Sequence, residues 1–284
     1  MGFLDDAAID TEKDRAPRLG MKGRCKLCLK DMVDLQDSHF LPAGIYRIIR
    51  DAKEDNPNPL EITEKTAVQT SRQVTAWLLC RCCEQRLSKN GEDWVLRNCL
   101  RSNSRFSLAS ILALQTPDVS LATTPTRLYY ASKIPKIDVS ALAYFAASIF
   151  WRGSIHCWND NGSIPVKLGP FQEQFRKYLM GESTFPKDCS LWVVVREGTK
   201  LNRLTAFPVG ERKGLFHLHQ FPMPGFAFSL VVGKNVPPLY REWCFVYGVG
   251  NPIIVTPIIE ELLAEKAVKL YERAVAAQVR RRVT

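Results

Sequence analysis

The longest apolar stretch of the chain follows Asp138 and reads ALAYFAASIFWRG. It is apolar on nearly every side of a helical projection, which predicts a helix that is buried all round. Asp138 or Ser140 would cap its first turn, because a short polar side chain can accept a hydrogen bond from a free backbone N–H group. The pattern therefore predicts a central helix in the second half of the chain.

Two further helices are expected in the second half. One begins after Gly169–Pro170, since proline suits the first helical position, and ends at Gly181. The other begins at Thr256–Pro257 and continues to about Arg282. The apolar stripe of the first of these helices consists of Phe171, Phe175, Tyr178 and Leu179.

Runs rich in Val, Phe and Leu lie between these helices and are separated by Gly, Pro and Asn turns. Such runs are typical of antiparallel strands. We expect the strands at 191–195, 204–209, 215–218, 226–232 and 244–247. The second half is therefore predicted to be an α+β domain with an antiparallel sheet and a long C-terminal helix.

The chain of 284 residues is longer than one domain of roughly 100–200 residues, which favours two domains. Residues 1–20 are polar and predicted to form a mobile arm. Residues 21–102 hold two cysteine pairs, residues 103–137 contain three proline-bearing breaks and are expected to connect the halves, and residues 138–284 form the α+β domain. A short helix is compatible with 108–114, and we expect the part beyond about 136 to fold on its own.

Composition narrows the class of protein. Hydrophobic residues make up 46% of the chain and charged residues 24%, as in globular proteins. The first residues lack the apolar core of a secretory signal, and no apolar run approaches the ~20 residues that cross a bilayer. We therefore expect a soluble, cytoplasmic protein without a membrane partner. The net charge of +10 suits a nucleic acid or another anionic partner, and it is equally compatible with solubility alone.

Four of the nine cysteines form two Cys-x-x-Cys pairs, within GRCKLCLK and LLCRCCEQRL. A two-residue gap lets a tight turn present both thiolates to one tetrahedral ion. The alternatives are incidental buried thiols or a redox pair, and the latter is disfavoured because neither pair lies in a βαβ unit. Cys82 could be a spare or an alternative ligand. The predicted structural zinc ligands are Cys25, Cys28, Cys80 and Cys83.

A second group of polar residues follows the first cysteine pair in DSHFLPAGIYR. If this segment is a strand, Asp37 and His39 point to one face, because side chains alternate along a strand. A carboxylate and an imidazole on one face can bind a metal or act as a base. Asn56 or Asn58 could orient the imidazole. The alternative is that His39 caps a loop or packs beside the cysteines.

The order of these motifs resembles that of the zinc-containing HNH endonucleases, whose fold is the treble clef, or ββα-metal finger. The resemblance covers roughly 65–80 residues and implies a structural zinc on the four cysteines. It implies that His39 is the general base, that Asn56 or Asn58 orients it, and that nucleic acid, with DNA expected, is cleaved with Mg²⁺ or Mn²⁺.

The chain departs from the family pattern at two positions. Glu84 stands where the family has a histidine after the second cysteine pair, and Ser38 separates Asp37 from His39. Glu84 is an oxygen ligand that could hold Mg²⁺ or Mn²⁺ together with Asp37. It could equally mark a non-catalytic zinc module that binds nucleic acid or a protein partner. The predicted catalytic residues are His39, Asp37, Glu84 and Asn58.

The segment after the second cysteine pair is rich in basic residues. In the resembling nucleases the corresponding helix lies against the DNA backbone, where cationic groups neutralise phosphates. The alternative is a solvated helix face. The residues concerned are Arg86, Lys89, Arg97, Arg101 and Arg105.

The second half offers no mechanism of its own. It could recognise a protein partner, bind a ligand or regulate the first half. His217 and His219 alternate on a predicted strand and could chelate a metal, but no acidic or thiolate partner stands nearby in the sequence. We therefore expect both histidines at the surface.

Overall fold

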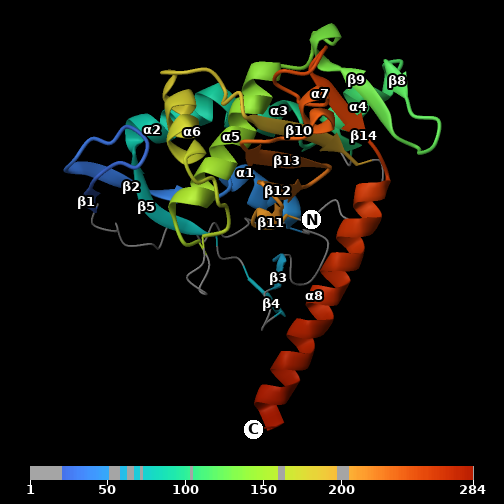
Figure 1. The fold of residues 1–284 in the computed structure, drawn as a ribbon. Helices are drawn as coiled ribbons and strands as arrows, with labels where there is room; N and C mark the ends of the chain where they lie inside the picture. The colour runs from blue at the N-terminus through green and yellow to red at the C-terminus, as the bar shows by residue number, and fades with distance from the viewer. Residues whose placement is uncertain are drawn as a thin grey trace, which may run out of the picture.

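The computed structural model describes residues 21–50, 58–62, 67–70, 73–102, 105–158, 164–196 and 205–283. It confirms the predicted α+β class, with a cysteine cluster near the N-terminus and a long C-terminal helix. Figure 1 shows that the C-terminal helix extends away from the body of the molecule. The predicted arm, residues 1–20, lies outside the described residues.

The N-terminal module, residues 21–102, is built on a three-stranded antiparallel sheet of order β1-β2-β5. Its strands are β1 (Lys22–Gly23), β2 (Val33–His39) and β5 (Thr75–Cys80). A continuous helical stretch follows β5 as α2 (Arg81–Leu87), a π-helical turn η1 (Ser88–Glu92) and α3 (Asp93–Asn98). The module thus combines a cysteine turn, the antiparallel strand pair β2–β5 and a helix, in the order expected for the predicted zinc module.

Shorter elements fill the rest of the module and the segment that follows it. Between β2 and β5 lie α1 (Ala43–Ile49), β3 (Leu60–Ile62) and β4 (Ala67–Gln69). After α3 come β6 (Arg101–Ser102), β7 (Arg105–Phe106), α4 (Ser107–Ala113), β8 (Val119–Ser120), β9 (Arg127–Tyr130) and η2 (Ala131–Lys133). The short helix expected at 108–114 is confirmed as α4.

The second half contains a seven-stranded sheet of order β11-β12-β13-β10-β14-β9-β8. Its remaining strands are β10 (Cys189–Val195), β11 (Val209–Lys213), β12 (Phe216–Met223), β13 (Phe226–Gly233) and β14 (Pro252–Val255). All neighbours are antiparallel except β10 and β14, which are parallel. The sheet is therefore mixed rather than purely antiparallel.

Two predicted strands are misplaced. Residues 205–208 are not a strand, and β11 begins at Val209, where that prediction ended. Residues 244–247 form a turn after α7 (Pro238–Glu242), and the strand lies farther on as β14. The sequence of this turn resembles that of a strand because its apolar residues pack into the core, where Cys244 and Phe245 are buried. The Phe245 N–H donates a hydrogen bond of 2.7 Å to Leu191 O.

The helices of the second half agree with the sequence pattern. They are α5 (Val139–Ile155), α6 (Phe171–Met180) and α8 (Ile258–Val283). Asp138 caps α5 by accepting a hydrogen bond of 2.8 Å from the Ala141 N–H, and α5 is buried on nearly all sides. Gly181 ends α6 with a φ of 76°. Pro170 precedes the first helical position of α6 rather than occupying it.

One hydrophobic cluster contains residues from both halves of the chain. Phe40 of the N-terminal module lies 6.4 Å, between ring centroids, from Phe221 of β12, and Phe150 of α5 lies 6.5 Å from the same ring. β9, within the predicted connector, pairs with β14 in the large sheet. The domain boundaries themselves stay a prediction.

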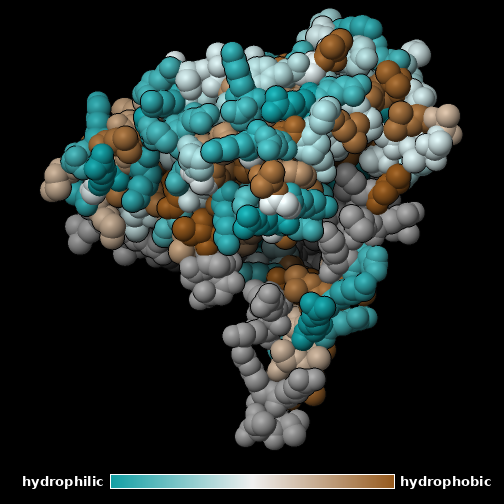
Figure 2. Space-filling model, in the orientation of Figure 1, coloured by the Kyte–Doolittle hydropathy of each residue, from teal (hydrophilic) through white to brown (hydrophobic). Residues whose placement is uncertain are grey.

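Hydrophilic residues cover most of the face seen in Figure 2, with apolar side chains scattered between them. In the described part of the chain, every helix is too short or too polar to span a bilayer.

Candidate metal centre and the adjoining hollow

The four predicted zinc ligands are brought together by the N-terminal module. Cys25 and Cys28 lie in a tight turn between β1 and β2, which is closed by a hydrogen bond of 2.9 Å from the Leu29 N–H to Cys25 O. Cys80 is the last residue of β5 and Cys83 lies in the first turn of α2. A local turn and a strand-to-helix junction thus each present one pair of thiols.

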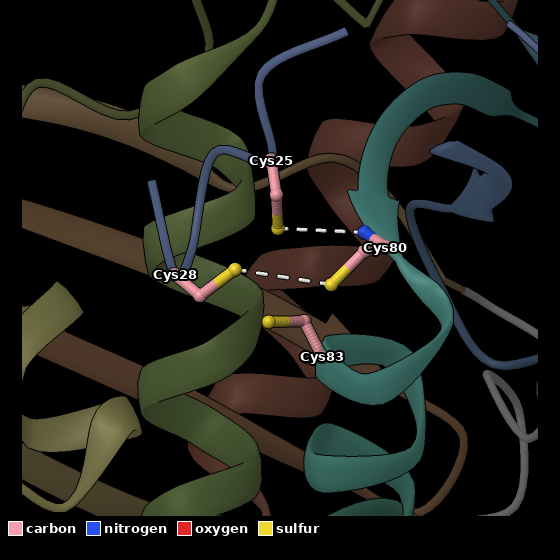
Figure 3. A group of neighbouring side chains, drawn as sticks. All are labelled: Cys25, Cys28, Cys80 and Cys83. Carbon is pink, nitrogen blue, oxygen red and sulfur yellow. Dashed lines mark hydrogen bonds between the residues drawn. The ribbon is translucent and has the colours of Figure 1, made fainter. Parts of the chain in front are cut away.

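The sulfur atoms of these four cysteines all lie within 4.8 Å of one another. The Cys28 and Cys80 sulfurs are 3.8 Å apart, and four thiolates about 2.3 Å from a tetrahedral zinc ion lie about 3.8 Å apart. Figure 3 shows the side chains pointing toward one another. The cysteine cluster can therefore hold a metal ion such as zinc.

The electrostatics of the cysteine cluster favour a bound cation. The pKa of Cys25 is lowered to about 4, chiefly by a hydrogen bond from the Cys83 thiol and despite burial, with help from the Cys80 N–H at 3.4 Å. The same thiol pair raises the pKa of Cys83, and burial raises that of Cys28. Holding all four cysteines as thiolates in one buried group therefore requires positive charge among them.

Cys82 is exposed and is not a member of the cluster. This resolves the alternative of Cys82 as a ligand. Its neighbours Cys80 and Cys83 are buried, so Cys82 differs from them in exposure. It is therefore a natural control for experiments on the four ligands.

A hollow of about 250 Å³ adjoins the N-terminal module and contains two of the predicted catalytic residues. His39 enters it from the end of β2, and Glu84 enters it from α2, directly after Cys83. We call it the His39 hollow. It is lined by His39, Pro42, Ala43, Gly44, Arg47, Glu84, Ser88, Glu92, Asp93, Leu96 and Arg152.

The other two predicted catalytic residues do not line the His39 hollow. Asp37 is not among the residues that line it. The pairing of β2 with β5 shifts register just before this residue, between Gln36 and Asp37. Asn58 Oδ1 instead accepts a hydrogen bond of 3.2 Å from Arg50 Nη2, and Asn56 lies outside the described residues. Within the described ranges, the cysteine cluster is the one group of three or more His, Cys, Asp or Glu residues close enough to share an ion.

Arg152 is the residue of the His39 hollow that the sequence analysis missed. It comes from α5 and only 2% of its side chain is exposed. Nη2 donates to Glu92 Oε1 at 2.7 Å and lies 3.8 Å from Glu84 Oε2. Burial alone would lower the pKa of Arg152, but these carboxylates outweigh burial and raise it. The sequence did contain a signal for this residue. Arg152 stands in a helix predicted to be buried on all sides, and a buried charge requires a partner of opposite charge.

The helical stretch after β5 approaches α5 closely. η1 is a π-helical turn, a feature often found at functional sites. A Cβ at Gly91 would lie 2.8 Å from the Phe145 backbone N, so only glycine permits this approach. The result is that Glu92, next to Gly91, reaches Arg152.

The five predicted nucleic-acid contacts differ in their surroundings. Lys89 and Arg97 are exposed on η1 and α3. Arg86 Nη1 donates a hydrogen bond of 3.2 Å to Met180 O, at the end of α6. The side chains of Arg101 and Arg105 lie outside the described residues. Lys89 and Arg97 are therefore the better placed of the five to meet phosphates.

The expectation that both histidines of the second pair lie at the surface is wrong for His219, which is 1% exposed. Its Nε2 lies 3.2 Å from Lys167 O, and its ring stacks on that of His217 with centroids 6.0 Å apart. Gly210, opposite on β11, leaves room for the ring, since a Cβ there would lie 2.6 Å from His219 Nδ1.

No family model, no curated protein and no solved structure matches this chain. The assignment of function therefore depends on the residues and geometry described above.

Proposed function

We propose that the chain is a zinc-stabilised, HNH-like nuclease that hydrolyses phosphodiester bonds in the His39 hollow. The observation that carries the proposal is that His39 and Glu84 line one hollow beside the cysteine cluster. The two residues belong to different elements, β2 and α2, and the resemblance to HNH endonucleases assigned them to one site.

Zinc is the ion proposed for the cysteine cluster, since four closed thiolate ligands are typical of structural zinc. Its role is to hold the cysteine turn, the β2–β5 strand pair and α2 together. In this way it fixes the distance between the end of β2, which carries His39, and the start of α2, which carries Glu84.

His39 acts as the general base. An imidazole can take up and release a proton near neutral pH, so it can accept a proton from the attacking water. Arg47 also lines the hollow and offers a guanidinium to a substrate phosphate. The roles first assigned to Asp37 and Asn58 stay predictions, because neither side chain lines the His39 hollow.

Glu84 fits the role of ligand to a divalent cation. Its Oε1 is buried and, among the described residues, has no hydrogen-bond partner. Such an oxygen carries a desolvation cost that a bound cation would remove. Mg²⁺ or Mn²⁺ held there would stabilise the negative charge that develops on the leaving oxygen.

The proposal is tested by incubating the zinc-loaded protein with plasmid, linear and single-stranded DNA and with RNA, in Mg²⁺ or Mn²⁺. We expect cleavage by the wild type and a loss of about 10²–10⁴-fold in His39→Ala. His217→Ala is the matched control, since His217 lies on β12 and does not line the hollow. Cleavage that survives His39→Ala would show that His39 is not the base.

A non-catalytic module that binds nucleic acid is the second candidate. The ion pair between Arg152 and Glu84, at 3.8 Å, favours it, because a guanidinium already neutralises part of the carboxylate charge. Salt-sensitive binding without cleavage of any of these substrates would select this function over hydrolysis.

A further inference from the structure

Arg152 joins three parts of the N-terminal module to α5. Its Nη2 bonds Glu92 in η1 and approaches Glu84 in α2. Its Nη1 donates a hydrogen bond of 3.4 Å to Phe40 O, in the residue that follows His39. The second half of the chain thus contributes a buried cation to the wall of the His39 hollow.

The two carboxylates are not held equally. Arg152 lies 2.7 Å from Glu92, whose side chain is 11% exposed, and 3.8 Å from Glu84, whose side chain is 26% exposed. A distance of 2.7 Å is that of a charge-assisted hydrogen bond, whereas 3.8 Å is beyond hydrogen-bonding range. Arg152 therefore interacts more strongly with Glu92 than with Glu84.

The single Arg152 guanidinium neutralises Glu92 more fully than Glu84. Arg152 and Glu92 together are neutral, and Glu84 adds one negative charge at the more open side of the group. Its Oε1 is also the oxygen that has no hydrogen-bond partner within the described chain. A cation entering the hollow would meet Glu84 rather than Glu92.

We infer that Arg152 is a positioning residue that divides the two carboxylates, binding Glu92 and leaving Glu84 to hold the divalent cation. The inference rests on the proposed function for the identity of the site. Arg152 also ties the end of β2 to this group through Phe40 O, so it relates His39 to the cation ligand. The N-terminal module by itself lacks this residue.

Only an arginine meets these acceptors together. Its planar guanidinium presents several N–H donors in a fixed fork, whereas a lysine ammonium is a single point of charge. The close approach of η1 to α5 at Gly91 brings the fork within reach of Glu92. Arg152→Lys therefore keeps the charge but loses the link to Phe40 O.

The inference is tested by Mn²⁺ binding to the zinc-loaded full chain, measured by electron paramagnetic resonance without substrate. We expect Glu84→Gln to weaken Mn²⁺ binding by at least about tenfold, since it removes the charged ligand. Glu92→Gln should also weaken it, because Arg152 then turns to Glu84. Arg152→Gln should strengthen it by about tenfold, because a positive charge beside the ion is removed.

The double variant Glu92→Gln, Arg152→Gln is the decisive control. It removes a neutral pair, so Mn²⁺ affinity should return close to that of the wild type, and the variant leaves no unpaired buried charge if Arg152→Gln alone fails to fold. Zinc content and thermal unfolding verify each variant. An affinity that Glu92→Gln leaves unchanged, or that the double variant fails to restore, would overturn the inference.

The Mn²⁺ measurement separates this inference from the proposed function. The expected binding pattern without any cleavage would support the role of Arg152 and reject hydrolysis. Cleavage by a wild type that binds no Mn²⁺ would reject the role of Arg152 and retain hydrolysis.

Discussion

Arg176 Nη1 donates a hydrogen bond of 2.9 Å to the carbonyl oxygen of Leu27, between the two cysteines of the first pair. Arg176 lies on α6, and its other guanidinium nitrogens bond Glu173 at 2.8 and 2.9 Å and Glu182 at 3.3 Å. A helix of the second half thus holds the cysteine turn from outside. The cysteine turn is therefore contacted by a residue that is distant in sequence.

We expect Arg176→Gln to loosen the cysteine turn. The change leaves Leu27 O and two carboxylates without their donor. The free energy of unfolding should therefore fall by about 2 kcal/mol. Zinc should also pass faster to a chromogenic chelator. Arg97→Gln, on the exposed face of α3, is the control and should change neither the stability nor the rate. Equal rates in the two variants would contradict a supporting role for Arg176.

The protein is expected to bind about one zinc per chain. Cys25→Ser and Cys80→Ser should lose the metal and unfold the N-terminal module, because metal-binding energy in such modules is folding energy. Cys82→Ser changes a neighbouring thiol that is exposed and outside the cluster, so its zinc content should equal that of the wild type. Elemental analysis and thermal unfolding are the measurements. Zinc lost equally from the Cys82 variant would refute the ligand assignment.

Nucleic-acid binding should be salt-sensitive and depend on Lys89 and Arg97. Each phosphate contact contributes about 0.9 to the slope of log K against log salt for duplex DNA. Lys89→Glu and Arg97→Glu should each weaken binding and reduce that slope by about one. Lys234→Glu, an exposed position beyond β13, is the matched charge control. Fluorescence anisotropy across salt concentrations provides the test, and equal losses in all three variants would indicate net charge alone.

The stability of the protein should fall between pH 6.5 and pH 4 because of His219. Burial lowers its pKa to about 4, although the Lys167 carbonyl opposes the shift. Below pH ~6.5 the unfolded state binds a proton that the folded state takes up only near pH 4, so the unfolding free energy decreases as the pH falls. The loss should reach roughly 2–3 kcal/mol.

His219→Phe should remove most of this pH dependence, and His217→Phe should retain it. Urea unfolding at several pH values measures the effect. A pH profile that is the same in His219→Phe and the wild type would show that the imidazole is accessible to protons in the folded state.

The elements that the sequence predicted well are those with strong local signals. Asp138 and Gly181 mark a helix start and a helix end by their own conformations, and both boundaries are confirmed. The misplaced strand at 244–247 shows the limit of this reasoning. Its apolar residues are buried because a turn packs into the core beside Leu191, and burial without periodicity does not distinguish a turn from a strand.

In the candidate site, too, the features set by local sequence were predictable and those set by long-range contacts were not. The cysteine cluster was predictable because each pair is set by a gap of two residues, a purely local relationship. His39 and Glu84 line the same hollow, and in the sequence only a family resemblance linked them. The sequence could flag Arg152 as a buried charge, but it could not identify its partner, because the bond to Glu92 joins residues 60 apart in the chain.

By itself the sequence determined the α+β class, the four clustered cysteines and the main helices, since caps, periodicity and short spacings act within a few residues. Only the tertiary structure decided which charges meet. The approach of α5 to η1 at Gly91 places Arg152 between Glu92 and Glu84. That approach results from close packing between segments that are distant in sequence, and short-range sequence patterns do not determine such packing.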